Sequence, residues 1–403
     1  MSFPGPFGGG GNPFEGMPIF GDLAKMFQNQ GPVNWEVARQ IGSFMASQGE
    51  AETNVEPLVR IRFEELARVA EMHVADRTGL PTMVDGRPLT VVPTTRGAWA
   101  ASTLEAYRPL FEKLALSLGQ GSLTTPPIDE SDLPDELKGQ MPEELLGNLM
   151  QVIAPTILGM QLGLMTGHLA RRSLGQYDLP VPRPASSELL VVAANLDAFA
   201  GDWSLPQDDV RLWVCLDNIT HAAVLGLPHV RSRLLELLES FASGFRPDPE
   251  ALSRQLEGID PTNAEAWQDA FGDPRALLGS MESDEQRAIK PQLEAITVAV
   301  EGYVDYVLDT VGERLIGSYG PLAEALRRRR VEANQGDRFV EQMFGLELSQ
   351  PQYDRGERFV RGIVERAGED ALIRLWSDAR HLPTPSEVDA PGLWWERVNL
   401  PEG

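Results

Sequence analysis

Residues 211–224 read RLWVCLDNITHAAV, and this stretch decides how the fold is interpreted. Its nearly continuous apolar side chains predict a helix at 208–225. Within this helix Asp217 and His221 are four residues apart, so both project from the same helical face. By spacing alone, the pair is an Asp–His contact satisfied within the core or at the surface, and the surrounding sequence has to show whether it carries chemistry.

Helical patterns dominate the rest of the chain, which predicts a mainly α fold with a small minor β-sheet. Asn34 is expected to cap the first ordered helix. The expected helices are 34–47, 57–79, 99–118, a pair within 142–174, 208–225, 228–243, 263–271 and 282–312. The expected strands are the short apolar runs 89–92 and 188–196.

Two helices carry patterns that predict which side chains are buried. The run 327–330 consists of four arginines, and on an acidic helix such a run is expected to be a solvated face. In helix 57–79, one apolar side is expected to contain Leu58, Ile61, Phe63, Leu66 and Val69.

The composition changes along the chain and predicts its organisation. Residues 1–32 are rich in Gly, Pro and Phe and are expected to form a flexible tail. A helical part follows at 33–180, and 181–346 is predicted to be the core that carries the informative helix. Residues 347–403 are expected to close this core as a helical segment packed against it.

The charge balance limits the classes of partner. The 35 basic residues against 59 acidic residues give a net charge of −24, which argues against a protein that binds nucleic acid through phosphate contacts. Cys215 is the single cysteine, so neither an internal disulfide nor a cysteine-based zinc site is expected. Together with the lack of a signal-peptide pattern, this predicts a cytoplasmic protein.

The segment 145–170 is long and apolar enough to span a membrane, and it carries no lysine, arginine or acid. Gly159, Gly163 and Gly167 place small residues on one helical face, as in helices that pack closely in lipid. Pro155 and several polar side chains interrupt the segment, which favours a buried central helix. A membrane-associated helical protein therefore remains an alternative, although no membrane partner is expected.

The Asp217–His221 pair can also be compared with the His-Glu-x-x-His motif of zincins. In that motif two histidines bind Zn²⁺ from one helical face, and the glutamate takes a proton from the metal-bound water. Here the first histidine is Asp217, the glutamate is Asn218, and the second histidine is His221. An amide accepts no proton near neutral pH, so Asn218 at the position of the general base is expected to be inactive.

Several stretches beyond this motif, in conserved order and spacing, resemble a bacterial zincin-like family labelled as associated with deazaflavin-cofactor biosynthesis. The resemblance covers most of the chain from Val33 onward and implies a zinc-dependent metallopeptidase fold. The stretches that carry it are VNWEVARQI, EPLVRIRFEELARVAEMHVADRTGL, ARRSLGQYDLPVP, RLWVCLDNITHAAV, VEGYVDYVLDTVG and LELSQPQYDRGERFVRGIVERAG.

The resemblance also implies a second helix that contributes to the site. The family carries Glu-Gly-His-x-x-x-Val-Met-Asp, and the equivalent residues here are 301–309, EGYVDYVLD. Glu301 is the candidate for the third metal ligand, since catalytic zinc sites use three protein ligands. Tyr303 stands where the family has histidine, and Asp305 is a further pocket candidate. Without the resemblance, Glu301 and Asp305 would be ordinary helix-packing charges.

These substitutions favour a zincin-like pseudoenzyme that binds a peptide or protein, with no metal and no cofactor expected. In this interpretation Asp217 pairs with His221 and raises its pKa. The alternative is an active hydrolase in which Asp217, His221 and Glu301 hold Zn²⁺ or a harder divalent ion. Tyr303 or Asp305 would then replace Asn218 as the base.

Overall fold

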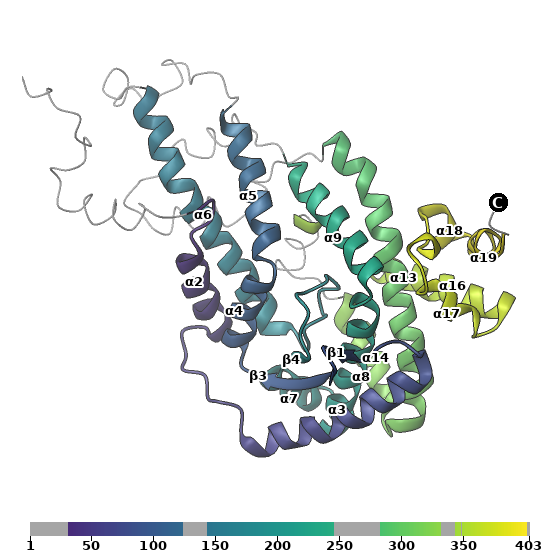
Figure 1. The fold of residues 1–403 in the computed structure, drawn as a ribbon. Helices are drawn as coiled ribbons and strands as arrows, with labels where there is room; N and C mark the ends of the chain where they lie inside the picture. The colour runs from purple at the N-terminus through teal and green to yellow at the C-terminus, as the bar shows by residue number, and fades with distance from the viewer. Residues whose placement is uncertain (1–30, 124–142, 246–282, 332–342, 348, 401–403) are drawn as a thin grey trace, which may run out of the picture.

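Helices make up most of the structure, a computed structural model, and the predicted mainly α fold is confirmed (Figure 1). Among the described residues, the strands form two small sheets of two strands each, and one isolated β-bridge joins Gly175 to Val191. The helix expected at 263–271 and most of the tail expected at 1–32 lie outside the described residues. The structure describes residues 31–123, 143–245, 283–331, 343–347 and 349–400.

The described elements follow one another along the chain, and a group of short helices lies at the C-terminal side. The helices are α2 (Trp35–Ser47), α3 (Pro57–Thr78), α4 (Arg96–Ala106), α5 (Arg108–Leu123), α6 (Glu143–Arg172), α7 (Ala193–Asp202), α8 (Gln207–Leu225), α9 (Pro228–Ser243), α13 (Asp284–Leu315), α14 (Tyr319–Val331), α16 (Gln350–Ala367), α17 (Ala371–Leu375), the 3-10 turn η2 (Ala379–His381), α18 (Pro385–Asp389) and α19 (Pro391–Asn399). The strands are β1 (Met83–Val84), β2 (Arg87–Pro88), β3 (Thr90–Thr94) and β4 (Glu188–Val192).

The glycine face of α6 packs against α2 at very short range. A Cβ added at Gly159 would lie 2.4 Å from the carbonyl oxygen of Asn34, and one at Gly163 would lie 2.6 Å from that of Ala38. Asn34 also caps α2 as predicted, because its side chain accepts a hydrogen bond from Val37 N at 3.1 Å. The small residues of α6 therefore serve close packing between helices inside the protein.

By length and hydropathy, no single helix in the described part of the chain qualifies as a membrane span. One bent pair, α8 with α9 at 85°, meets the criterion on length and composition.

The central helix α8 is buried along almost its whole length, because it is apolar on nearly every side. It packs against α3, α7, α9 and the long helix α13. Beside α8, strands β3 and β4 pair in parallel over five residues each. One hydrophobic cluster runs through these elements from Val33 to Trp394. The division of the chain at 180 and 346 stays a prediction.

The single helix expected at 99–118 is wrong, because α4 ends at Ala106 and α5 begins at Arg108. Pro109 has no backbone N–H and its ring excludes a continuous helix through this point. Tyr107, at the break, is buried, and its hydroxyl donates a hydrogen bond to the carbonyl oxygen of Val181 at 3.1 Å.

The strand expected at 188–196 is also shorter than predicted, because it ends at Val192 and Ala193 begins α7. Its partner, expected at 89–92, continues instead to Thr94. Pairing between β3 and β4 ends at Thr94–Val192, and within the described ranges neither strand has a partner beyond this pair.

The apolar side predicted for helix 57–79 is divided between two faces. Phe63 and Leu66 are buried as expected, whereas Leu58, Ile61 and Val69 are exposed. Ala67, Ala70 and Val74 complete the buried face, so α3 carries apolar side chains toward the core and toward the solvent.

Candidate functional site

The two helices singled out by the sequence cross at the centre of the protein. Asp217, Asn218 and His221 lie on α8, and Glu301 lies on α13. All four are buried, with Asn218 fully enclosed and Asp217 and Glu301 each 7% exposed. Buried charges require partners, so the contacts of these side chains determine what the site can do.

His221 lies between two carboxylates that contact opposite nitrogens of its ring. Nδ1 lies 3.1 Å from the carbonyl oxygen of Asp217 and 3.4 Å from its Oδ1 atom. Nε2 lies 3.1 Å from Oε1 of Glu301, which reaches it from α13. The structure thus brings Asp217, His221 and Glu301 into one cluster, here called the Asp–His–Glu cluster.

The electrostatics of the cluster favour a charged histidine. Burial disfavours the imidazolium, but the carboxylates of Asp217 and Glu301 outweigh it and raise the pKa of His221 well above its ordinary value. In the protonated state both ring nitrogens donate, so each carboxylate accepts a charge-assisted hydrogen bond or contact. The cluster is therefore an internal ion network that joins α8 to α13.

The amide of Asn218 is held by backbone groups of the segment between α6 and β4. Its Oδ1 atom accepts hydrogen bonds from Gln176 N at 2.8 Å and Tyr177 N at 3.4 Å. Its Nδ2 atom donates to the carbonyl oxygen of Val214 at 3.0 Å. An added Cβ at Gly175 would lie 2.1 Å from Nδ2 of Asn218, so the segment lies directly on α8.

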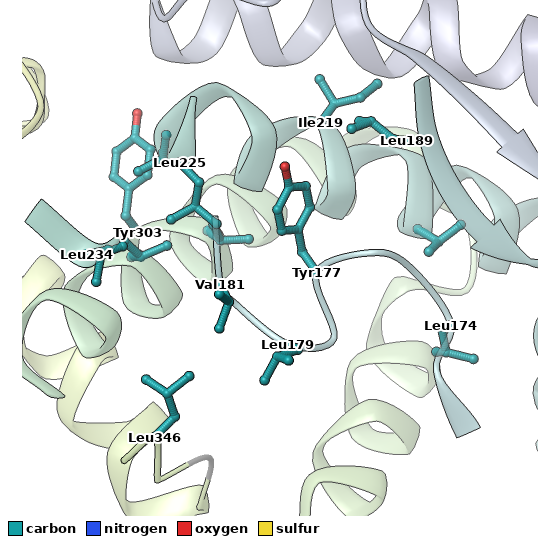
Figure 2. Close-up of a cluster of buried hydrophobic side chains, with 14 of the residues drawn as sticks. Leu174, Tyr177, Leu179, Val181, Leu189, Ile219, Leu225, Leu234, Tyr303 and Leu346 are labelled. Atoms are coloured by element: carbon teal, nitrogen blue, oxygen red, sulfur yellow. The ribbon is translucent and has the colours of Figure 1, made fainter. Parts of the chain in front are cut away.

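Tyr177 covers the cluster on the side of this segment. Its ring stacks on that of His221 with centroids 5.6 Å apart and planes at 15°. Figure 2 shows the ring projecting from the segment that carries Leu174 and Leu179. Burial raises the pKa of Tyr177 to about 12, against the charge of Arg183, so its hydroxyl stays neutral. His221 is consequently only 2% exposed.

The two pocket candidates from α13 lie outside the Asp–His–Glu cluster. Tyr303 is buried and packs edge-on against Trp376 at 5.3 Å, within the hydrophobic cluster of Figure 2. Asp305 forms a two-bond ion pair with Arg330 of α14, at 2.7 and 2.8 Å. None of the contacts found for Tyr303 or Asp305 joins it to His221.

The solvated face predicted at 327–330 is wrong for its second half. Arg327 and Arg328 are exposed, but Arg329 pairs with Asp178 at 2.6 Å and Arg330 with Asp305. Burial opposes the charge of Arg330, yet Asp305 and Glu301 hold its pKa above the ordinary range. A charge run alone could not reveal this, because its acidic partners lie on other elements.

Tyr353 and Tyr177 are site residues that the sequence did not single out. The guanidinium of Arg330 lies 4.0 Å from the ring centroid of Tyr353, which borders the charged network from α16. Both tyrosines lie inside stretches that carry the family resemblance, but neither has a spacing that marks it as functional.

The Asp–His–Glu cluster does not fit the zinc ion that the resemblance implies. A catalytic zinc needs three protein ligands directed at one point. Glu301 faces Nε2 of His221, but Asp217 faces the Nδ1 edge, and the lone pairs of these nitrogens diverge. Only two donors therefore converge. In the described part of the chain, no group of three or more His, Cys, Asp and Glu side chains is placed to hold a metal.

The chain is similar to known proteins at the level of family and fold. A crystal structure from Chloroflexus aurantiacus, described as a candidate hydrolase with a novel fold, is 25% identical in sequence and superimposes with a TM-score of 0.60. The similarity covers 92% of this chain and 100% of the other. No curated protein matches the sequence. The zincin-like metallopeptidase family matches residues 33–395, so this chain belongs to that family.

Proposed function

We propose that this protein is a non-hydrolytic member of the zincin-like metallopeptidase family that acts as a peptide- or protein-binding scaffold. One observation carries the proposal: Asp217 and Glu301 contact opposite nitrogens of His221, so the three side chains do not converge on one ion. A zinc peptidase directs its ligands at one metal ion, whereas in this chain Asp217, His221 and Glu301 contact one another.

The chemistry of Asn218 supports the loss of hydrolysis. Its side chain stands where zincins have the catalytic glutamate, and an amide cannot take a proton from water near neutral pH. Its oxygen is already bonded to Gln176 N and Tyr177 N. Loss of a general base alone lowers a rate by roughly 10²–10⁴.

The scaffold role places binding on the outer surface, because Tyr177 and its segment cover the Asp–His–Glu cluster. The net charge of −24 favours a partner with a basic contact surface, through electrostatic steering. The single, buried Cys215 suits the reducing cytoplasm, which we propose as the location. The link to deazaflavin-cofactor biosynthesis has no support in the residues of the site.

Elemental analysis of untagged full-length protein tests this function, combined with hydrolysis of a mixed peptide library. We expect less than about 0.1 equivalent of zinc and no cleavage above a buffer control, because two converging donors bind zinc weakly. One equivalent of metal, with cleavage that stops in His221→Ala, would refute the proposal.

A second candidate is a hydrolase that uses an Asp/His/Glu metal site. The observation in its favour is the contact of Glu301 with Nε2 of His221, since these two donors lie close enough to share an ion. This candidate predicts a metal-dependent activity that disappears in both Asp217→Ala and Glu301→Ala. Wild-type protein that shows no activity after reconstitution with Zn²⁺, Mn²⁺ and Co²⁺ would exclude it.

A further inference from the structure

Helix α3 carries an apolar stripe that faces away from the protein. Its buried side packs on α8 and β3, with Phe63, Ala67, Ala70 and Val74 almost fully enclosed. Helix α3 runs along one edge of the molecule (Figure 1). Its opposite side bears Leu58, Ile61, Val69 and Met72, which are 38–75% exposed. We call these four residues the α3 stripe.

The α3 stripe is narrow and symmetric in sequence. At 100° per residue its members and Glu65 fall within roughly 80° of the helix circumference. Leu58 and Ile61 precede Glu65 by the same spacings at which Met72 and Val69 follow it. A rotation of the helix by 180° about an axis through Glu65 therefore places each apolar residue of the stripe at the position of another.

This symmetry is what a two-fold contact between identical helices requires. In a two-fold interface, if one residue contacts a second on the partner, the second also contacts the first. An antiparallel pair of α3 helices centred on Glu65 would place Leu58 opposite the other copy's Met72, and Ile61 opposite its Val69. All four exposed apolar side chains would then be covered.

The charges beside the α3 stripe are compatible with the same arrangement. Glu65 lies at the centre and pairs with Arg62 of its own helix at 2.8 Å on one flank, while Arg68 lies on the other flank. Arg68 is largely exposed, and its contact with Glu64 is long, at 3.9 Å. In the antiparallel pair, Arg68 of each copy would lie beside Glu65 of the other, which offsets the approach of the two glutamates at the axis.

We propose that the α3 stripe is the interface between two copies of this chain, packed as antiparallel helices about a two-fold axis at Glu65. The occupant is thus a second copy, selected by the symmetry of the stripe and by its charges. A single helix pair buries less than the standard interface of about 1,600 Å², so the dissociation constant is expected on the order of 10 µM.

Sedimentation velocity of the full-length protein tests the association. The wild type should shift from monomer to dimer between about 1 and 100 µM, as a micromolar constant requires. The double variant Ile61→Asp/Val69→Asp should remain monomeric, with an unchanged circular dichroism spectrum. The matched control Leu393→Asp, at an exposed apolar residue of α19, should dimerise like the wild type. A monomeric wild type, or a double variant that still dimerises, overturns the proposal.

A disulfide cross-link tests the position of the axis. Cys215 is buried and is the single cysteine, so an introduced surface cysteine reacts without background. Glu65→Cys should form a covalent dimer under mild oxidation, because the two copies meet there. Asp76→Cys should not, because the antiparallel pair places these residues about 33 Å apart. Cross-linking through Asp76→Cys but not through Glu65→Cys would rule out the antiparallel arrangement.

Discussion

At the scale of single residues, the protonation state of His221 determines the chemistry of the site. An imidazole that donates from both nitrogens cannot offer a lone pair to a metal, whereas a neutral one can. Its surroundings are Asp217 on α8, Glu301 on α13 and the ring of Tyr177 from the segment before β4. Two carboxylates and one neutral ring favour the charged form despite burial.

The raised pKa of His221 predicts how stability depends on pH. In the unfolded chain histidine titrates near 6.5, so the stabilisation by the charged form is fully present below this value. It is lost as pH rises through the folded pKa, by up to about 1.4 kcal/mol per pH unit. Urea unfolding between pH 6 and 9 should show this decline, and His221→Gln should flatten it. Nitrogen-15 spectra that show a neutral ring at pH 7 would contradict the prediction.

Removal of one carboxylate should leave a buried charge with too few partners. Glu301→Gln is expected to lower the free energy of unfolding by about 3 kcal/mol, as for other broken buried ion pairs. The control Glu236→Gln removes an exposed partner of Arg233 and should lower it by less than about 1 kcal/mol. Chemical denaturation of both variants measures the difference, and equal losses would show that the cluster contributes no more than a surface pair.

At the scale of elements, two helices cross where neither can carry a side chain. Gly302 of α13 faces Gly356 of α16, and a Cβ at Gly302 would lie 2.2 Å from the carbonyl carbon of Gly356. This contact sets the position of α16 against α13, next to Glu301. The glycine after Glu301 is therefore required by packing between helices, whatever the chemistry of its neighbour.

Gly302→Ala should accordingly destabilise the protein by at least about 1–3 kcal/mol, because the two helices would have to separate. Gly201→Ala is the matched control, since Gly201 lies near the end of α7 with no atom within 4 Å of the added Cβ. Helix propensity predicts that this control is neutral or slightly stabilising. Thermal unfolding compares the two; similar melting temperatures would mean that the crossing adapts without loss.

At the scale of the whole molecule, the site depends on elements that are far apart in the chain. α8, α13 and the segment before β4 meet because the apolar sides of both helices share one hydrophobic cluster. Arg329 and Arg330 then join this centre to α14 through Asp178 and Asp305. The family scaffold is thus retained around a centre whose ligand geometry differs from a zinc site.

Introduction of the His-Glu-x-x-His pattern that the resemblance implies should give this scaffold a metal. The variant Asp217→His/Asn218→Glu supplies a second imidazole and a general base, and with Glu301 it completes a three-ligand set. We expect about one equivalent of zinc by elemental analysis and a zinc-dependent rise in melting temperature, as for any ligand that binds the native state. The single change Asn218→Glu serves as control and should stay metal-free. If the double variant also fails to bind zinc, the scaffold cannot host the family site.

The sequence by itself determined the mainly α fold, the cap at Asn34 and the positions of α8, α9 and α13 to within a few residues. These follow from periodicity, capping and proline, which are local properties of the chain. It also marked Asp217, Asn218, His221 and Glu301, through spacing and family resemblance. It failed at the break at Tyr107, although Pro109 is a local signal of that break, and on α3, where the contacts with α8 and β3 decide which side is buried.

Only the tertiary structure decided what the marked residues contact. Spacing places Asp217 and His221 on one face, but it does not tell which nitrogen each carboxylate reaches, because that depends on how α13 crosses α8. The stacking of Tyr177 and the pairing of Arg330 join residues far apart in sequence, and local patterns carry no record of such contacts. Burial opposes the charge of His221, but the carboxylates of Asp217 and Glu301 outweigh it, since a low dielectric strengthens each ion pair that is fully partnered.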